Sequence, residues 1–92
     1  MPAHDRAQTS DVTVVVVNWR QAELTARALT SLRSQTISHR VLLVDNASGD
    51  GSVDSLAAGF PEAEVLELPE NVGFAGGMAA ALARIDTRFV AL

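Results

Sequence analysis

The residues from Val12 to Val17 are almost all β-branched and apolar, and this run constrains the fold more than any other feature. Such a run favours a strand that is buried on both faces, as in the middle of a parallel sheet. A second apolar run, residues 41–44, follows after a stretch long enough for a helix. Strands separated by helix-length segments pair in parallel through right-handed crossovers. The sequence therefore predicts an α/β fold.

The rest of the chain continues this alternation. We expect strands at 12–17, 41–44, 64–68 and 87–92, and helices at 21–35, 52–59 and 78–85. Leu24, Ala28 and Leu32 recur every four residues and Leu29 flanks them, so we expect these residues to form the apolar face of an amphipathic first helix. The glutamates of the third strand favour an edge position. These features predict a Rossmann-like parallel sheet of order 3-2-1-4, with helices on both faces and a ligand crevice over strands 1 and 4.

Composition excludes several classes of protein. The net charge is −4, and every basic residue is an arginine, which is unlike the positive surface of a nucleic-acid binder. Without cysteine there is no disulfide, thiolate metal site or thiol nucleophile. No apolar run approaches the roughly 18 residues of a membrane span. Residues 1–10 are polar and aperiodic, and we expect a disordered leader there, without the apolar core of a signal peptide. We expect a cytoplasmic location, including the inner face of the membrane.

Candidate ligand-binding residues follow three of the expected strands. They are Asn18, Trp19 and Arg20 after the first strand, Asp45 after the second, and Asn71, Gly73 and Gly76 after the third. Carboxyl ends of parallel strands meet at one edge of a sheet, which is where α/β proteins bind ligands. The first of these loops has no glycine, which excludes a dinucleotide-binding fingerprint. A P-loop is excluded because the chain has no lysine.

Asp45 and Trp19 together suit a nucleobase. A carboxylate can accept a hydrogen bond from a ring N–H, and an indole offers a face for stacking. Structural roles remain open beside these: Asp45 can cap its own turn, Trp19 can lie in the core, and Gly73 and Gly76 can serve packing alone. Asp50 is interpreted first as a helix cap.

Three segments, in this order and spacing, resemble glycosyltransferase family 2, whose nucleotide-binding half has the GT-A fold. They are Val14 to Trp19, Leu43 to Ser52 and Asn71 to Gly77, and the likeness covers residues 11–92. Within that family, the chain most resembles the bacterial rhamnosyl- and galactofuranosyl-type transferases. The resemblance implies that Asn18 and Trp19 flank the base and that Asp45 accepts from its ring. It also implies that Asn71, Gly73 and Gly76 lie near the ribose, diphosphate or donor sugar.

The resemblance further implies an inverting transfer of sugar from a UDP or dTDP donor to a glycan or lipid-linked acceptor, in cell-wall or surface polysaccharide synthesis. Mg²⁺ or Mn²⁺ would be held by an Asp-x-Asp motif, and we expect this chain to end before that motif. No residue here is therefore assigned a catalytic or metal-binding role, and we expect the chain alone to be inactive and to self-associate. Arg20 departs from the small polar residue usual in the family and is a candidate to reach the diphosphate. The alternatives are a nucleotidyltransferase-like protein and a non-catalytic binding module.

Overall fold

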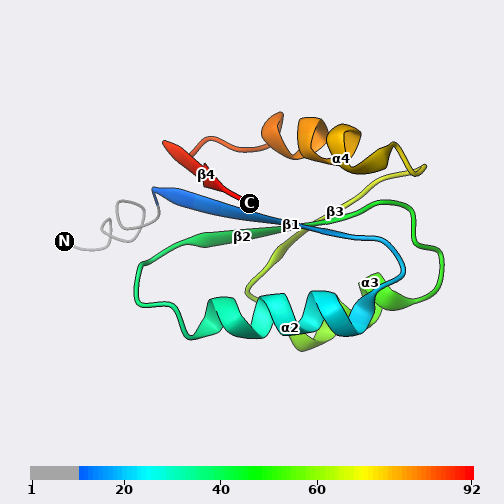
Figure 1. The fold of residues 1–92 in the computed structure, drawn as a ribbon, viewed down its shortest axis with the longest axis horizontal. Coiled ribbons are helices and arrows are strands. Elements are labelled where there is room, and N and C mark those ends of the chain that lie inside the picture. Colours follow the sequence, from blue (N-terminus) through cyan, green and yellow to red (C-terminus); the bar gives the residue numbers. More distant parts are fainter. Residues whose placement is uncertain (1–10) are drawn as a thin grey trace.

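A parallel sheet of four strands, in the order β3-β2-β1-β4, forms the centre of the molecule (Figure 1). The computed structural model describes residues 11–92, so the predicted leader lies outside the described residues. The strands are β1 (Val12–Asn18), β2 (Arg40–Asp45), β3 (Glu64–Glu67) and β4 (Phe89–Ala91). The predicted order 3-2-1-4 and the edge position of β3 are confirmed.

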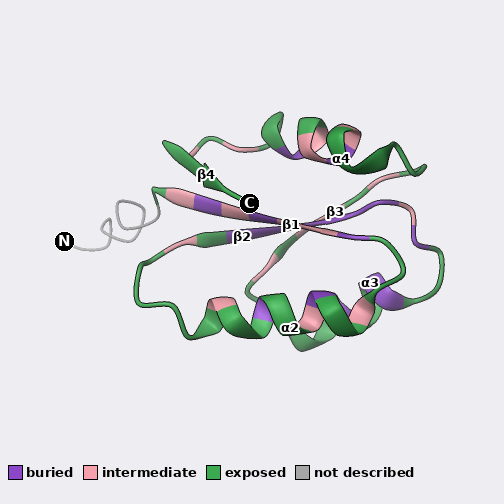
Figure 2. Cartoon of the chain, in the orientation of Figure 1, coloured by how far each residue is buried: buried purple, intermediate pink, exposed green. Residues whose placement is uncertain are grey.

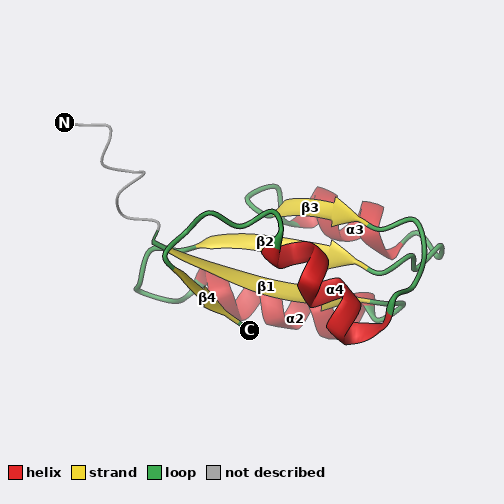
Figure 3. Ribbon diagram, turned by 90° about the horizontal axis from the view of Figure 1, so that it is seen from above, coloured by secondary structure: helices red, strands yellow, loops and turns green. Residues whose placement is uncertain are grey.

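Three helices cover the two faces of the sheet. Helices α2 (Ala22–Arg33) and α3 (Ser52–Gly59) lie against one face, and α4 (Gly73–Leu82) lies against the other. The view from above shows α4 crossing in front of β1 and β2, with α2 and α3 behind the sheet (Figure 3). The predicted arrangement of helices on both faces is therefore confirmed.

The core forms two layers because side chains alternate along β2. Val41 and Leu43 pack towards α2 and α3, whereas Leu42 and Val44 pack towards α4. Burial is concentrated in β2 and in the adjoining part of β1 (Figure 2). Complete burial of one such side chain contributes about 1.5–3 kcal/mol to stability. The middle strands are thus held by apolar burial on both faces, as their sequences predict.

The predicted apolar face of α2 is wrong in part. Leu29 is buried as expected, but the other buried residue is Thr25, while Leu24 is 56% exposed and Ala28 is also exposed. Residues one position apart lie about 100° apart around a helix, so this small shift turns a different face to the sheet. Leu32 is half-buried against the core, as expected. A polar partner decides the rotation, because the Thr25 hydroxyl bonds to Asn18.

The predicted start of the last helix is also wrong. The glycine-rich segment expected to form a turn is itself helical, so α4 begins at Gly73 rather than at residue 78. The helix ends at Leu82, and Ile85 lies beyond it, packed against the core. Low helix propensity misled the prediction, because packing against the sheet overrides the propensity of glycine.

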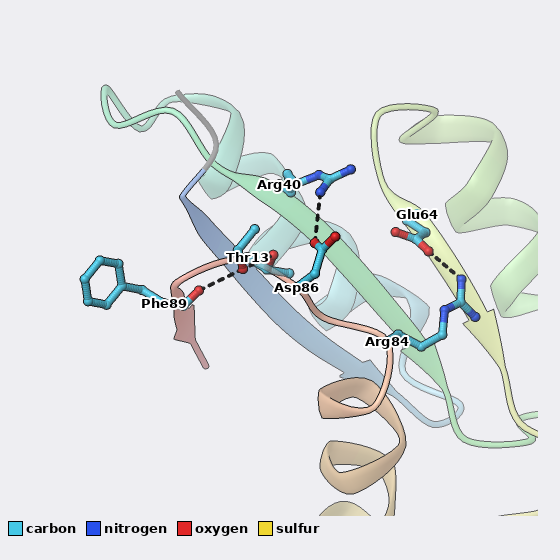
Figure 4. A network of polar contacts seen from close by, with 7 residues as sticks. Thr13, Arg40, Glu64, Arg84, Asp86 and Phe89 are labelled. Carbon is cyan, nitrogen blue, oxygen red and sulfur yellow. Dashed lines mark hydrogen bonds and ion pairs between the residues drawn. The ribbon is translucent and has the colours of Figure 1, made fainter. Parts of the chain in front are cut away.

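Strand β4 is short and exposed and is anchored at the amino end of the sheet (Figure 4). The Thr13 and Thr87 hydroxyls lie 2.7 Å apart, and the Phe89 amide donates to the Asp11 carbonyl at 3.0 Å. Nearby, Arg40 pairs with Asp86 and Arg84 pairs with Glu64. Among residues 11–92, we find no helix with the length and apolarity to cross a membrane.

Candidate functional site

Asn18 and Asp45 are register partners at the carboxyl ends of β1 and β2. Both side chains are almost completely buried, with exposed fractions of 0% and 1%. Asn18 Nδ2 donates to Asp45 Oδ1 at 2.8 Å. The two loops that follow the central strands are therefore joined directly at their origin.

Hydroxyl groups from other segments complete this buried network. Ser48 donates through its backbone amide to Asp45 Oδ2 at 3.0 Å and through its hydroxyl to Asp45 Oδ1 at 2.7 Å. Asn18 Nδ2 also reaches the Ser52 hydroxyl at 3.0 Å, and Thr25 donates to Asn18 Oδ1 at 2.7 Å. Within residues 11–92, every buried side-chain nitrogen and oxygen has a partner. A fully satisfied network of this kind favours one arrangement of the loops.

The loop between β2 and α3 has unusual backbone conformations on both sides of Ser48. Ala47, Gly49 and Gly51 all have positive φ, and a non-glycine residue such as Ala47 rarely adopts that region. Asp50 accepts from the Ser52 amide at 3.0 Å. Hydrogen bonds from the Ser52 hydroxyl and amide lower the pKa of Asp50. The predicted role of Asp50 as the helix cap is wrong, because Gly51 is the N-cap of α3 and no side chain caps this helix; Asp50 instead closes a turn one residue earlier.

An open pocket of about 280 Å³ lies beside this network, on the α4 side of the sheet. Trp19, 44% exposed, forms part of its wall together with Asn71 and Gly73, so three of the predicted site residues meet there. The remaining lining residues come from β1, from the two loops and from α4: Val17, Gln21, Asn46 and Phe74. Two aromatic side chains beside polar amides suit a flat ligand with polar edges.

The other predicted site residues do not line the pocket. Asn18 and Asp45 belong to the buried network, Arg20 bonds to Ser48, and Gly76 lies in α4. Both Asp45 oxygens accept hydrogen bonds from its own loop, as the capping alternative described. A base would reach Asp45 only if residues 46–52 opened. Direct contact between Asp45 and a base therefore stays a prediction.

Asn46 lines the pocket, whereas the sequence had suggested its neighbour Asp45 for that position. Its side chain accepts from the Val72 amide and donates to the Gly73 carbonyl, both at 3.0 Å. Asn46 thereby ties the loop after β2 to the start of α4. Alternation of side chains is the signal that finds it, because Asp45 continues the face of Leu43 and Asn46 continues that of Val44. Gln21 and Phe74 were also missed, and neither has a distinctive sequence signal.

The glycines at the start of α4 have different structural roles. Gly73 has φ of +76°, and its amide donates to Asn71 Oδ1 at 2.8 Å. A Cβ at Gly76 would lie 2.8 Å from the Cβ of Val72, closer than side chains approach. A Cβ at Gly77 would make only ordinary contacts, the nearest at 3.7 Å from Val17. Gly76 therefore allows the close approach of Val72, which lies one helical turn earlier.

A second pocket of about 310 Å³ lies at the opposite end of the sheet, between the end of α2 and the start of β2. Its charged side chains Arg33 and Glu62 pair with each other, and the His39 ring bonds to the Ile37 carbonyl. We therefore place the candidate site in the pocket at the carboxyl end of the sheet, although it is slightly smaller than the second pocket. The described part of the chain holds no cluster of three or more His, Cys, Asp or Glu suited to a metal ion.

Comparison with known proteins identifies the class to which this architecture belongs. The model of glycosyl transferase family 2 matches residues 13–92, so the chain belongs to that family. A search of curated protein sequences finds no match. The structure is similar to that of a mannosyltransferase from Pyrobaculum calidifontis in complex with GDP-Man and Mn²⁺, with a TM-score of 0.70 and 28% identity. The match covers 83% of this chain and 24% of the mannosyltransferase, so this chain spans about a quarter of the length of the mannosyltransferase. The predicted Rossmann-like N-terminal half of a GT-A fold is confirmed.

Proposed function

We propose that this chain forms the donor-binding part of a glycosyltransferase that transfers sugar from a nucleotide diphosphate to an acceptor hydroxyl. The observation that carries the proposal is the pocket with Trp19 on its wall, at the carboxyl ends of the strands in a family 2 fold. In this proposal the nucleobase stacks on Trp19, and stacking of this kind is worth about 1–3 kcal/mol per base. Asn71 and Gly73 lie beside the ribose or diphosphate.

The buried residues have a supporting role in this proposal. Asn18 and Asp45 hold the two loops that shape the pocket, and Gly76 leaves room for Val72 at the start of α4. The general base that takes the acceptor proton is not assigned to residues 11–92. These residues therefore contribute binding and orientation of the donor rather than the bond-breaking step.

The donor and the metal are proposed from likeness. We propose UDP or dTDP as the carrier, and the similar mannosyltransferase adds GDP as a candidate because its structure contains GDP-Man. That structure also contains Mn²⁺, which supports a divalent cation, Mg²⁺ or Mn²⁺, in the complete enzyme. Residues 11–92 do not fit a metal site, since no suitable ligand cluster is present among them. We assign its ligands to an Asp-x-Asp motif after the β4 region.

The biological setting is likewise a proposal. The family resemblance supports an inverting enzyme of the bacterial rhamnosyl or galactofuranosyl type, which acts on glycan or lipid-linked acceptors in the cytoplasm or at the inner membrane face. We also propose that this 92-residue chain self-associates. The exposed edge of β4, with Phe89 and Leu92 56% and 80% exposed, supports that proposal.

The decisive test is a titration of Trp19→Ala with UDP, dTDP and GDP. We expect the variant to lose about 1–3 kcal/mol of binding free energy for the preferred nucleotide, as measured by calorimetry. Leu24→Ala is the matched control, because Leu24 is an exposed apolar residue of α2 outside the pocket. Equal affinity of the Trp19 variant and the parent chain would contradict a stacking site here.

A further inference from the structure

Arg20 has a backbone conformation that requires support from its surroundings. Its φ is +54°, in the left-handed region that residues with a side chain seldom adopt. The Arg20 amide donates to the Ser48 hydroxyl at 2.9 Å, and Arg20 Nε donates to the Ser48 carbonyl at 2.8 Å. Arg20 is thus held at two points by one residue of the neighbouring loop.

Ser48 is itself fixed by the buried network. It is 0% exposed, and its amide and hydroxyl both donate to Asp45. Asn18 Nδ2 approaches the same hydroxyl at 3.2 Å. The Ser48 hydroxyl therefore has its one proton and both lone pairs occupied, which leaves it little freedom to turn. A continuous chain of hydrogen bonds runs from Asp45 through Ser48 to Arg20.

The guanidinium of Arg20 lies over the indole of Trp19. Its central carbon is 5.0 Å from the ring centroid, within the range of a cation–π contact. Trp19 lines the pocket, whereas Arg20 does not. The guanidinium therefore contacts the indole from outside the pocket, and its Nε is already engaged with Ser48.

We propose that Arg20 is a positioning residue, which holds the indole of Trp19 at the pocket wall and leaves the opposite ring face to the ligand. The effect of Arg20 on nucleotide affinity rests on the proposed function. Its effect on the position of the Trp19 indole does not. Asp45 acts through the same chain of contacts, by fixing Ser48. A direct contact of Arg20 with the diphosphate is the competing hypothesis. The positioning role would affect binding of the base, whereas the direct role would affect binding of the diphosphate.

Fluorescence can test this inference because Trp19 is the only tryptophan of the sequence. Two variants of the 92-residue chain separate the possible causes. Arg20→Met removes the guanidinium and keeps an unbranched side chain. Arg20→Gly removes the guanidinium and also the backbone strain, so it should fold even if the strained backbone of the Met variant prevents folding. Arg27→Met is the matched control, because Arg27 is an exposed arginine of α2 outside the pocket.

The first readout is quenching of Trp19 by acrylamide without ligand, and the second is the affinity for uridine and for UDP. We expect both Arg20 variants to raise the quenching constant. We also expect them to lower the affinities for uridine and for UDP by the same factor, roughly two- to fivefold. The control should match the parent chain. Circular dichroism verifies that each variant is folded.

The outcomes separate this inference from the proposed function. Unchanged quenching in both Arg20 variants would overturn the positioning role, as would a loss of UDP affinity without a loss of uridine affinity. Raised quenching in both variants supports the positioning of Trp19. If the parent chain then binds neither uridine nor UDP, the nucleotide site proposed above fails while the contact between Arg20 and Trp19 stands.

Discussion

The two ends of the parallel sheet are held together in different ways. At the carboxyl end, Asn18, Asp45 and Ser48 form a buried network in which distant segments share hydrogen bonds. At the amino end, exposed ion pairs such as Arg40–Asp86 and Arg84–Glu64 link neighbouring elements (Figure 4). Both ends are rich in polar side chains, but only one is shielded from water.

The difference shows which polar contacts shape the molecule. An exposed ion pair contributes about 0–1 kcal/mol, because water and salt screen it and both side chains lose freedom. A buried polar group left without its partner costs about 1–3 kcal/mol, and more when it is charged. The carboxyl end therefore has a geometry that is costly to change, and it borders the proposed donor pocket.

The same substitution at the two ends gives the largest expected contrast. We expect Asp45→Ala to lower the free energy of unfolding by about 2–3 kcal/mol, because three hydrogen bonds to a buried carboxylate are lost. Asp86→Ala removes an acid that is 86% exposed and should cost less than about 0.5 kcal/mol. Urea unfolding of both variants measures the difference.

Asp45→Ala should also weaken UDP binding, by about 1–3 kcal/mol in calorimetry. Asp86→Ala should leave UDP affinity as it is. Similar losses of stability in the two variants would contradict a larger contribution from the buried network at the carboxyl end.

A second comparison concerns adjacent glycines of α4. Gly76→Ala should destabilise the protein by about 1–3 kcal/mol, because its new Cβ would overlap Val72 and force the start of the helix to move. Gly77→Ala meets only ordinary contacts and should stabilise by up to about 1 kcal/mol, since alanine is the better helix former. Thermal unfolding of the two variants measures both effects. Equal melting temperatures would contradict this assignment of the close contact.

The smallest expected effect is a pH dependence at the amino end. Hydrogen bonds from Arg33, and then its charge, lower the pKa of Glu62 from 4.5 to about 2. Because the folded-state pKa is the lower one, the stabilisation is present above pH 4.5 and is lost as the pH falls towards 2. The effect is small because both side chains are about half exposed.

Denaturation midpoints of the parent chain and of Glu62→Gln should therefore differ slightly near pH 6 and converge near pH 2. A difference that stays constant over this interval would exclude the ion pair as its source.

Much of the fold could be predicted from patterns in the sequence. The apolar runs of β1 and β2 and the acidic edge of β3 predicted the strands and their order. The face of α2 could not be predicted from leucine spacing, because Thr25 turns inward to bond with Asn18. The start of α4 was missed because glycine is a weak helix former, and the packing of Met78 and Ala81 in the core outweighs that weakness.

The site was predicted less completely than the fold. Trp19, Asn71 and Gly73 do line one pocket, and the sequence marked all three as loop residues after strands. Asp45 faces the other side of the sheet, and strict alternation along β2 already implied that Asn46 faces the pocket. Phe74 and Gln21 enter the pocket only because the start of α4 and the loop after β1 meet there.

Sequence patterns alone predict that this chain alternates strands with helices, that its strands run in parallel and that polar loops gather at one edge. Those properties follow from local periodicity and from the burial of apolar runs. The hydrogen bonds of Asp45 with Asn18 and Ser48, and the contact between Trp19 and Arg20, depend on tertiary packing. The bonds that Asn18 donates join positions 27 to 34 residues apart, and a contact at that separation depends on how the strands and helices pack.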